Sequence, residues 1–401
     1  MTAAVVAVIT WTALGEPAQG IVAAVTVLVI ACPHALGLAI PLVIAISTSI
    51  SARAGILVKD RLALERMRTV DAILFDKTGT LTRGNHAVVA HAAVAGRDAD
   101  AVLRIAAAAE GDSEHPIAKA IIKAGRATGN LPGVAAFEAL TGRGVRATID
   151  GHDIQVGGPA LLRELSITEP DELAVETGQW RQRGNAVVYV VDDAQVVGAI
   201  TVADEIRPES KAAVAGLHDR GKRVVLVTGD ARQVADAVAA ELGIDEVFAE
   251  VLPADKDATV AALQQRGLRV AMIGDGVNDA PALARADVGI AIGAGTDVAI
   301  ESAGVVLASD DPRSVIGVID LSRASYRKMI QNLVWGAGYN LAAIPVAAGA
   351  LSFAGITIPP AVAAIAMSLS TIIVAANAQL LRRLDLRPQH ATDAPTRRRG
   401  T

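Results

Sequence analysis

The sequence predicts an α/β protein that combines membrane helices with a doubly wound parallel-sheet domain carrying an inserted α+β domain. Two observations support this fold class. Three short apolar runs, at 72–75, 224–227 and 270–273, each end in a turn rich in Asp and Gly, as buried parallel strands do. In addition, two long stretches of the chain contain no Asp, Glu, Lys or Arg.

Composition favours a membrane protein, because the 401 residues are 52% hydrophobic and only 2% aromatic, with a mean hydropathy of +0.41. The charge-free stretches lie between Glu16 and Arg53 and between Lys328 and Arg382. Since about 20 apolar residues cross a bilayer, the first stretch predicts one span and the second predicts two. The predicted spans are 21–50, 330–350 and 357–381.

The amino-terminal segment 1–14 is apolar but too short to cross a bilayer comfortably, so we expect a partial transmembrane segment. A cleaved signal peptide is the alternative, although the segment has no basic start and no small-residue cleavage site. Basic residues flank the cytoplasmic ends of membrane spans. Arg53, Lys59, Arg323 and Arg382 therefore predict that the central region and the tail 382–401 are cytoplasmic in a multi-pass protein, most simply in the cell membrane.

The central region divides by pattern. Residues 51–82 and 201–313 alternate buried strands with helices, which predicts a linker and a doubly wound domain. Residues 83–200 interrupt it with β stretches and Ala-rich helices, which predicts an inserted α+β domain. The formal net charge is −5. We expect no nucleic-acid partner.

The most informative motif is Asp76-Lys77-Thr78-Gly79-Thr80, directly after the first apolar run. A carboxylate at the carboxyl edge of a parallel sheet, beside a lysine and a bound Mg²⁺, is placed to receive a phosphoryl group. Such an aspartate can attack the γ-phosphate of ATP and form an aspartyl-phosphate. A strand-ending Asp alone would more often cap a helix or form a turn, but five successive residues are far more specific.

Two further strand ends complete this predicted site. Thr228-Gly229-Asp230 offers a hydroxyl for a phosphoryl oxygen, and the run from Gly274 to Asp279 offers carboxylates for Mg²⁺ and an amide for phosphate. Lys256 is a further cation for the phosphate. The candidate catalytic residues are Asp76, Lys77, Thr78, Thr228, Gly229, Asp230, Lys256, Asn278 and Asp279, and the candidate Mg²⁺ ligands are Asp76, Thr78 and Asp275.

With these motifs in this order, the chain resembles the P-type ATPases, which contain a haloacid dehalogenase-like phosphorylation domain. The resemblance runs nearly end to end. It implies that the insert 83–200 binds ATP, because the nucleotide domain of heavy-metal members carries a His-Pro motif with a Glu five residues upstream. Here Glu110 matches that Glu, and His115-Pro116 match the motif. Gly142 and Gly144 match the glycine pair of that family; at Gly157-Gly158-Pro159 the chain departs from the Asn that related domains often carry.

Polar groups inside a membrane are costly, so they are candidates for the transported ion. Cys32-Pro33-His34 combines a helix-breaking proline with a thiol and an imidazole, which suit copper or zinc; a simple Pro kink is the alternative. The resemblance favours the metal ligands, because heavy-metal pumps carry Cys-Pro-Cys, Ser-Pro-Cys or Cys-Pro-His at this point. The candidate ion ligands and supports are Cys32, His34, Tyr339, Asn340, Met367 and Ser368. This set resembles the copper subgroup, with silver as a companion of Cu(I); the oxidation state stays open.

The resemblance also shows what this sequence lacks. No Thr-Gly-Glu motif, which in this family positions the hydrolytic water, occurs in the chain. Thr177-Gly178-Gln179 has no carboxylate and falls in the insert. The main expectation is an ATP-driven copper exporter of which this chain is an incomplete catalytic portion, with a missing amino-terminal half as partner. The alternatives are a membrane-anchored phosphatase of the haloacid dehalogenase class and a non-transporting remnant that binds nucleotide or metal.

Overall fold

The computed structural model describes residues 1–140, 143–293 and 296–389, which form two compact units. The helical unit comprises Met1–Thr69, Gly304–Ser309 and, among the described residues, 314–389. The two-sheet unit comprises Val70–Ala303 and Asp310–Arg313.

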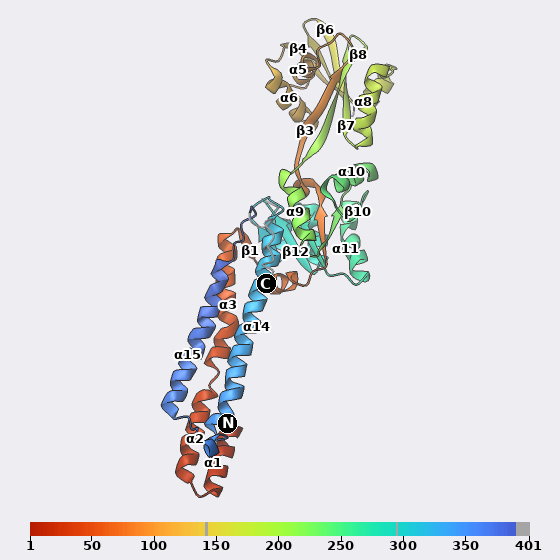
Figure 1. The fold of residues 1–401 in the computed structure, drawn as a ribbon. Helices are drawn as coiled ribbons and strands as arrows, with labels where there is room; N and C mark the ends of the chain where they lie inside the picture. The colour runs from red at the N-terminus through yellow and green to blue at the C-terminus, as the bar shows by residue number, and fades with distance from the viewer. Residues whose placement is uncertain (141–142, 294–295, 390–401) are drawn as a thin grey trace, which may run out of the picture. The chain divides into compact units, whose positions relative to one another are not determined.

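The first sheet of the two-sheet unit contains parallel strands in the order β12-β11-β2-β9-β10 (Figure 1). All five residues of the central strand β2 are buried, because helices cover both faces of a doubly wound sheet. These strands are β2 (Ala72–Asp76), β9 (Arg223–Val227), β10 (Glu246–Phe248), β11 (Val270–Gly274) and β12 (Val288–Ile292). The accompanying helices are α9 (Pro208–His218), α10 (Arg232–Leu242), α11 (Lys256–Gln265), α12 (Ala280–Arg285) and α13 (Asp297–Ser302).

The register of this sheet gathers the predicted motifs at one edge. Asp76 pairs with Val227 of β9, and Phe75 pairs with Ile273 of β11. The turns that follow β2, β9 and β11 therefore leave the sheet side by side, since the carboxyl ends of parallel strands meet at one edge.

The second sheet is antiparallel, in the order β3-β8-β7-β6-β5-β4, and it is inserted between β2 and β9. Side chains of β7 alternate between its faces: Val188 and Val190 pack with α5 and α6, whereas Val187 and Tyr189 pack with α7 and α8. The strands are β3 (Thr82–Ala93), β4 (Val134–Leu140), β5 (Gly144–Ile149), β6 (His152–Gly157), β7 (Ala186–Asp192) and β8 (Gln195–Ile206). The helices are α5 (Ala99–Ala109), α6 (Pro116–Thr128), α7 (Pro159–Leu165) and α8 (Asp171–Gln182).

In the helical unit, α3, α14 and α15 contact one another, and α1 packs against α2 (Figure 1). A short antiparallel pair, β1 with β13, follows α3 in the fold. The elements are α1 (Thr2–Ala13), α2 (Pro17–Ile30), α3 (His34–Arg53), β1 (Ile56–Val58), α4 (Arg61–Met67), β13 (Val305–Leu307), α14 (Ser314–Ala347) and α15 (Pro360–Gln379).

The single helix predicted over 21–50 is in fact two helices. The helix α2 ends at Ile30 and α3 begins at His34, so Ala31, Cys32 and Pro33 stand between them. Proline has no N–H and clashes with the preceding turn of a helix, which explains the break.

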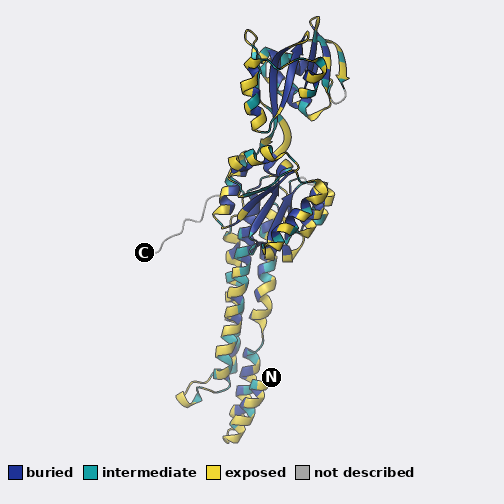
Figure 2. Ribbon diagram, turned by 90° about the vertical axis from the view of Figure 1, so that its right-hand side faces the viewer, coloured by how far each residue is buried: buried dark blue, intermediate teal, exposed yellow. Residues whose placement is uncertain are grey.

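Two helical stretches, Pro17–Arg53 and Pro360–Arg383, are long and apolar enough to cross a membrane. The span predicted over 330–350 lies in α14, which is not among them and contains Gln331, Asn332 and Asn340. Many large apolar side chains on these helices are exposed, among them Ile21, Leu341 and Ile365 (Figure 2). Exposed apolar surface of this extent is typical of helices that face lipid.

Candidate functional site

Asp76 is the last residue of β2, and its side chain is buried beside a lysine from another part of the chain. The Lys256 Nζ atom donates to Asp76 Oδ1 at 2.8 Å and to Asp279 Oδ1 at 2.6 Å. Lys256 begins α11, and Asp279 ends the short turn after β11. One ammonium group therefore bridges two buried carboxylates that come from separate strand ends.

The charges of this cluster do not balance. Burial raises the pKa of Asp76 above its ordinary value, and the neighbouring Asp279 charge adds to the increase, while Lys256 opposes it. The pKa of Asp275 is raised in the same way, first by burial and then by Asp279. Burial alone would lower the pKa of Lys256, but the two carboxylates more than offset this and the net direction is upward.

The donor set fits a hard divalent cation such as Mg²⁺. Carboxylate oxygens of Asp76, Asp275 and Asp279 lie within 4.8 Å of one another. Oxygen ligands with excess negative charge are what Mg²⁺ prefers. The sequence placed Asp76 and Asp275 among the ligands, and the structure adds Asp279. Gly79 (φ +73°) is required here, because a Cβ atom at this position would overlap the Asp275 carboxylate.

Lys77 does not contact Asp76 in the structure. Its buried Nζ forms ion pairs with Asp230 and, at 3.9 Å, with Asp204 Oδ2. Asp230 thus holds Lys77 in place from the turn after β9. The same turn is closed by Thr228, whose Oγ1 accepts from the Asp230 N–H at 3.2 Å.

The remaining predicted residues of this site are less enclosed. Thr78 lies in the loop after Asp76 and lines the cavity that also contains Lys77 and Asp230. Gly229 lies between Thr228 and Asp230 in the turn after β9. Asn278 is exposed on the short turn that carries Asp279.

Two residues at this site were missed by the sequence analysis, Asp204 and Arg207. Asp204 Oδ2 accepts from Thr82 Oγ1, and Arg207 donates to the carbonyl oxygens of Thr82 at 3.0 Å and Gly79 at 3.2 Å. Asp204 lies near the end of β8 and Arg207 directly follows that strand, where the chain leaves the inserted sheet. Their contacts there hold the loop that follows Asp76. The only sequence signal was the charged run 204–207 at the end of the predicted insert.

The predicted nucleotide residues Glu110 and His115 frame the turn between α5 and α6. His115 caps α6, because its Nδ1 accepts from the Ile117 N–H at 3.3 Å, and Pro116 follows as the first helical residue. Glu110 is buried, and burial raises its pKa to about 7, although a hydrogen bond from Ser113 opposes the increase. A buried carboxylate and an imidazole at one turn can contact a purine edge and face.

The glycine pair is only partly described, since Gly142 lies outside the described residues. Gly144 begins β5 with φ +139°, opposite Gly157 of β6. A Cβ atom on Gly144 would overlap the Val156 carbonyl, and one on Gly157 would overlap the Arg143 carbonyl. The close approach of these two strands is thus a structural reason for both glycines.

The predicted ion ligands of the helical unit are brought together only in part. Cys32 Sγ lies 3.9 Å from His34 Nε2 at the break between α2 and α3. Tyr339 packs on the apolar cluster that contains Ile30 of α2 and Ala363 of α15. Met367 is half-buried one turn after Ala363, and Asn340 is half-buried beside Tyr339. Ser368 instead lies on an exposed face and donates to Ala364 of its own helix at 3.0 Å.

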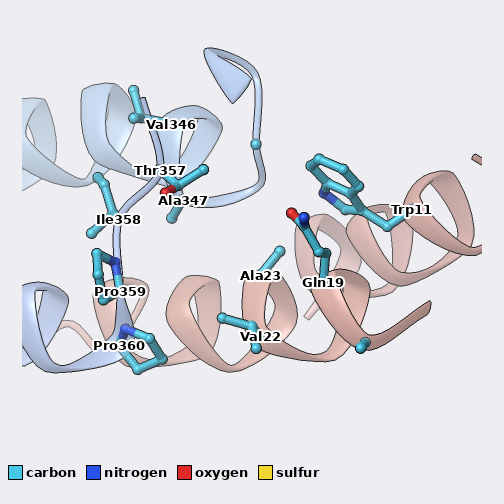
Figure 3. Close-up of a pocket in the computed structure, with 12 residues that line it drawn as sticks. Trp11, Gln19, Val22, Ala23, Val346, Ala347, Thr357, Ile358, Pro359 and Pro360 are labelled. Atoms are coloured by element: carbon cyan, nitrogen blue, oxygen red, sulfur yellow. The ribbon is translucent and has the colours of Figure 1, made fainter. Parts of the chain in front are cut away.

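A separate cavity of about 430 Å³ opens in the helical unit, where Trp11 and Gln19 face Val346 and Thr357 (Figure 3). The Trp11 Nε1 atom donates to the Ala348 carbonyl at 3.1 Å, which ties α1 to the end of α14. None of the residues predicted for the ion, nucleotide or phosphorylation sites lines this cavity.

Comparison with known families and proteins gives consistent matches. Residues 70–287 match the family model of the haloacid dehalogenase-like hydrolases. The chain is 52% identical over 360 residues to a protein named copper-exporting P-type ATPase B from Archaeoglobus fulgidus, covering 90% of this chain and 51% of the relative. It is 47% identical over 376 residues to a probable copper-exporting P-type ATPase V from Mycobacterium tuberculosis, covering 93% and 48%. The chain therefore spans about half the length of these curated relatives.

Solved structures match as well. A zinc-transporting PIB-type ATPase in the E2.Pi state superimposes with a TM-score of 0.82 at 33% identity, covering 94% of this chain and 61% of that one. The catalytic domain of the CPx-ATPase CopB-B superimposes with a TM-score of 0.52 at 30% identity, and this chain covers 98% of it.

Proposed function

Because the chain belongs to the haloacid dehalogenase-like hydrolases and, within them, to the heavy-metal P-type ATPases, we propose that it is the catalytic portion of an ATP-driven copper exporter. Asp76 is the residue that becomes phosphorylated. The observation that carries this proposal is the position of its carboxylate, buried at the end of β2 and bridged to Asp279 by Lys256.

The proposed reaction is a phosphoryl transfer to Asp76. A carboxylate oxygen of Asp76 forms a bond to the γ-phosphorus of ATP, the bond from that phosphorus to the β,γ-bridging oxygen breaks, and ADP leaves with the electron pair. Lys256 opposes the effect of burial on the pKa of Asp76 and so favours its charged form, and Thr228 and Asn278 offer donors for phosphoryl oxygens. Mg²⁺, held by Asp76, Thr78 and Asp275 with Asp279 nearby, supplies positive charge for the phosphate when bound.

The inserted sheet binds the base of ATP in this proposal. Glu110 accepts from the purine amino group and His115 lies against the ring, with Pro116 fixing the turn and Gly142 and Gly144 lining the approach. Burial of Glu110 and capping of α6 by His115 support a rigid turn at this point.

The proposed cargo is copper, with silver as an alternative soft cation. The thiol of Cys32 and the imidazole of His34 lie side by side at a helix break, where the His34 N–H donates to the Cys32 carbonyl at 3.0 Å. Met367, Tyr339 and Asn340 are proposed to complete the site, with Ser368 as a more distant support. The curated relatives are named as copper-exporting proteins, whereas the protein of the matching solved structure is named as zinc-transporting. The relatives, which have the higher sequence identity, favour copper.

We propose a multi-pass protein of the cell membrane with the two-sheet unit in the cytoplasm. A polypeptide that supplies the other half of the relatives' length is the proposed partner, because the actuator motif Thr-Gly-Glu is not in this sequence. That partner would provide the water-positioning group for hydrolysis.

Labelling with [γ-³²P]ATP in Mg²⁺ tests the proposal. The unchanged chain should take up an acid-stable label that hydroxylamine removes, and Asp76→Asn should abolish it. Asp71→Asn is the matched control, since Asp71 directly precedes the same strand, at the end opposite Asp76, where it pairs with Arg269. Label that persists in Asp76→Asn, or that is lost equally in Asp71→Asn, would contradict the assignment.

A further inference from the structure

A cavity of about 760 Å³ lies in the two-sheet unit, beside the loop that follows Asp76. Lys77, Thr78 and Asp230 line it on the side of the first sheet. The turn Arg183-Gly184-Asn185, between α8 and β7, lines it on the side of the inserted sheet. This volume is in the usual range for a small-molecule site, about 300–1,000 Å³.

The turn that contains Arg183 and Gly184 packs closely against α10. Gly184 has φ +75°, and a Cβ atom placed on it would lie 2.6 Å from the Val234 Cα atom. Val234 is in the first turn of α10, and that helix starts two residues after Asp230. Only a glycine fits between the turn and the helix, so Arg183 is held close to the loop that carries Asp230 and Thr228.

The Arg183 side chain is not paired with any of the carboxylates that also line this cavity, which are those of Asp204, Glu205, Asp230 and Glu241. Lys77 and Arg183 are the Lys and Arg residues in its lining. Lys77 is already paired with Asp230 and Asp204. The Arg183 guanidinium is exposed and makes no hydrogen bond or ion pair within the described part of the chain. The neighbouring Arg181, by contrast, is bound to Glu169 and Tyr189.

Phosphate is the ligand chemistry that matches this wall. A guanidinium binds phosphate oxygens through paired N–H donors, and it does so best where other charges do not compete. A phosphate chain with its last phosphorus at Asp76 would extend past Thr78 into this cavity.

We propose that Arg183 binds the phosphate chain of the nucleotide whose γ-phosphate is transferred to Asp76, an inference that rests on the proposed function. Arg183 acts on ATP affinity, because it contacts phosphates that remain on ADP. It has no part in the attack of Asp76 on phosphorus.

Two phosphoryl donors separate these roles. ATP carries the additional phosphates that Arg183 would contact, whereas acetyl phosphate has a single phosphoryl group and no nucleotide. In Arg183→Gln, we expect the ATP concentration for half-maximal labelling to rise about tenfold or more, as for a lost hydrogen bond to a charged group. Labelling from [³²P]acetyl phosphate should stay unchanged, which also reports that the variant is folded.

Arg183→Lys should recover part of the ATP affinity, and Arg163→Gln, an exposed arginine on α7 outside the cavity lining, is the matched control. Unchanged ATP dependence in Arg183→Gln would overturn the inference while the proposed function stands. An equal loss of labelling from both donors in that variant would also overturn it, in favour of a structural role. Failure of the unchanged chain to label from either donor would overturn the proposed function and this inference together.

Discussion

The single ammonium group of Lys256 is paired with two carboxylates, and both of these carboxylates are buried. The ammonium group lies within hydrogen-bond distance of Asp76 and Asp279. Removal of one partner from a buried ion pair leaves an uncompensated charge, which is far more costly than loss of a surface pair. We therefore expect Lys256 to stabilise the first sheet and to favour the ionised form of Asp76.

Lys256→Met should lower the free energy of unfolding by about 3–5 kcal/mol, the typical cost of breaking a buried ion pair. Urea unfolding in EDTA measures this, since added Mg²⁺ would itself offset carboxylate repulsion. The control is Lys211→Met, which removes an exposed lysine of α9. Equal midpoints and slopes for the two variants would contradict the bridging role of Lys256.

Glu110 predicts a pH dependence of stability. Burial raises its pKa in the folded protein to about 7, above the ordinary value of 4.5. Its contribution to stability is thus fully present below pH 4.5 and is lost as the pH rises through 7, where the buried carboxyl must ionise. Compared with Glu110→Gln, the unchanged protein should lose about 1.4 kcal/mol for each unit by which the pKa is raised.

Unfolding of both proteins at pH 5 and pH 8 checks this prediction. Glu114→Gln is the control, because Glu114 is exposed in the same turn. A difference between Glu110→Gln and the unchanged protein that is the same at both pH values would show that Glu110 is not held in a desolvated site.

The candidate residues at the strand ends could be recognised in the sequence, whereas two residues that contact the loop after Asp76 could not. Asp76, Thr228 and Asp275 each follow a buried apolar run, which is a local signal. Asp204 and Arg207 act on the loop after Asp76 across more than a hundred residues of sequence, and no spacing rule predicts such a contact. The pairing of Lys77 with Asp230, instead of with the phosphate site directly, was missed for the same reason.

Among the elements, the break between α2 and α3 is the one that bears most on ion binding. Cys32 lies in the break beside Pro33, and His34 is the first residue of α3, with the thiol and imidazole close together. A continuous helix would consume the carbonyl groups and would turn the two side chains to different faces, since residues two apart do not face each other.

Pro33→Ala should therefore reduce copper binding. We expect the copper retained by the detergent-solubilised variant after gel filtration to fall to the level of Cys32→Ala. Pro41→Ala is the matched control, because Pro41 lies inside α3 without interrupting it. Copper retention by Pro33→Ala equal to that of the unchanged chain would contradict a role for the break.

The predicted elements agree best with the structure where periodicity is strong. The five parallel strands and the antiparallel insert were predicted as a doubly wound domain and an α+β domain, and that fold class is confirmed. Pro33 was identified in the sequence as a helix-breaking residue, but one span was still predicted over 21–50, because the hydrophobic pattern continues through Ala31 and Pro33 without a change. The face occupied by Ser368 could not be predicted either, since exposure to lipid and to another helix leave the same apolar pattern.

At the scale of the whole molecule, the parts to compare are the two sheets and the length of the curated relatives. It contains a nucleotide-binding sheet and a phosphorylation sheet, but it spans about half the length of its curated relatives. Thr177-Gly178-Gln179 does not replace the actuator motif, because it lies within α8, where Thr177 is buried and bonded to Glu169 and Leu173.

We therefore expect this chain to form the aspartyl-phosphate slowly but not to sustain copper transport by itself. Hydrolysis of the intermediate requires a positioned general base, and coupling to ion movement requires the corresponding actuator. Copper flux into vesicles that contain only the 401-residue chain should stay at background. Addition of a polypeptide with a Thr-Gly-Glu motif and the preceding spans should restore it, whereas sustained flux without such a partner would contradict this expectation.

The identity of the phosphorylated residue tests the central claim most directly. Reduction of an acyl-phosphate with borohydride converts the modified aspartate to homoserine, and trypsin releases residues 69–77 as a peptide that contains both Asp71 and Asp76. After incubation with ATP and Mg²⁺, fragment-ion mass spectrometry should find homoserine at position 76 and unmodified aspartate at position 71. Homoserine at Asp71 or at another carboxylate such as Asp230, or none anywhere after the chain has taken up label, would contradict the account.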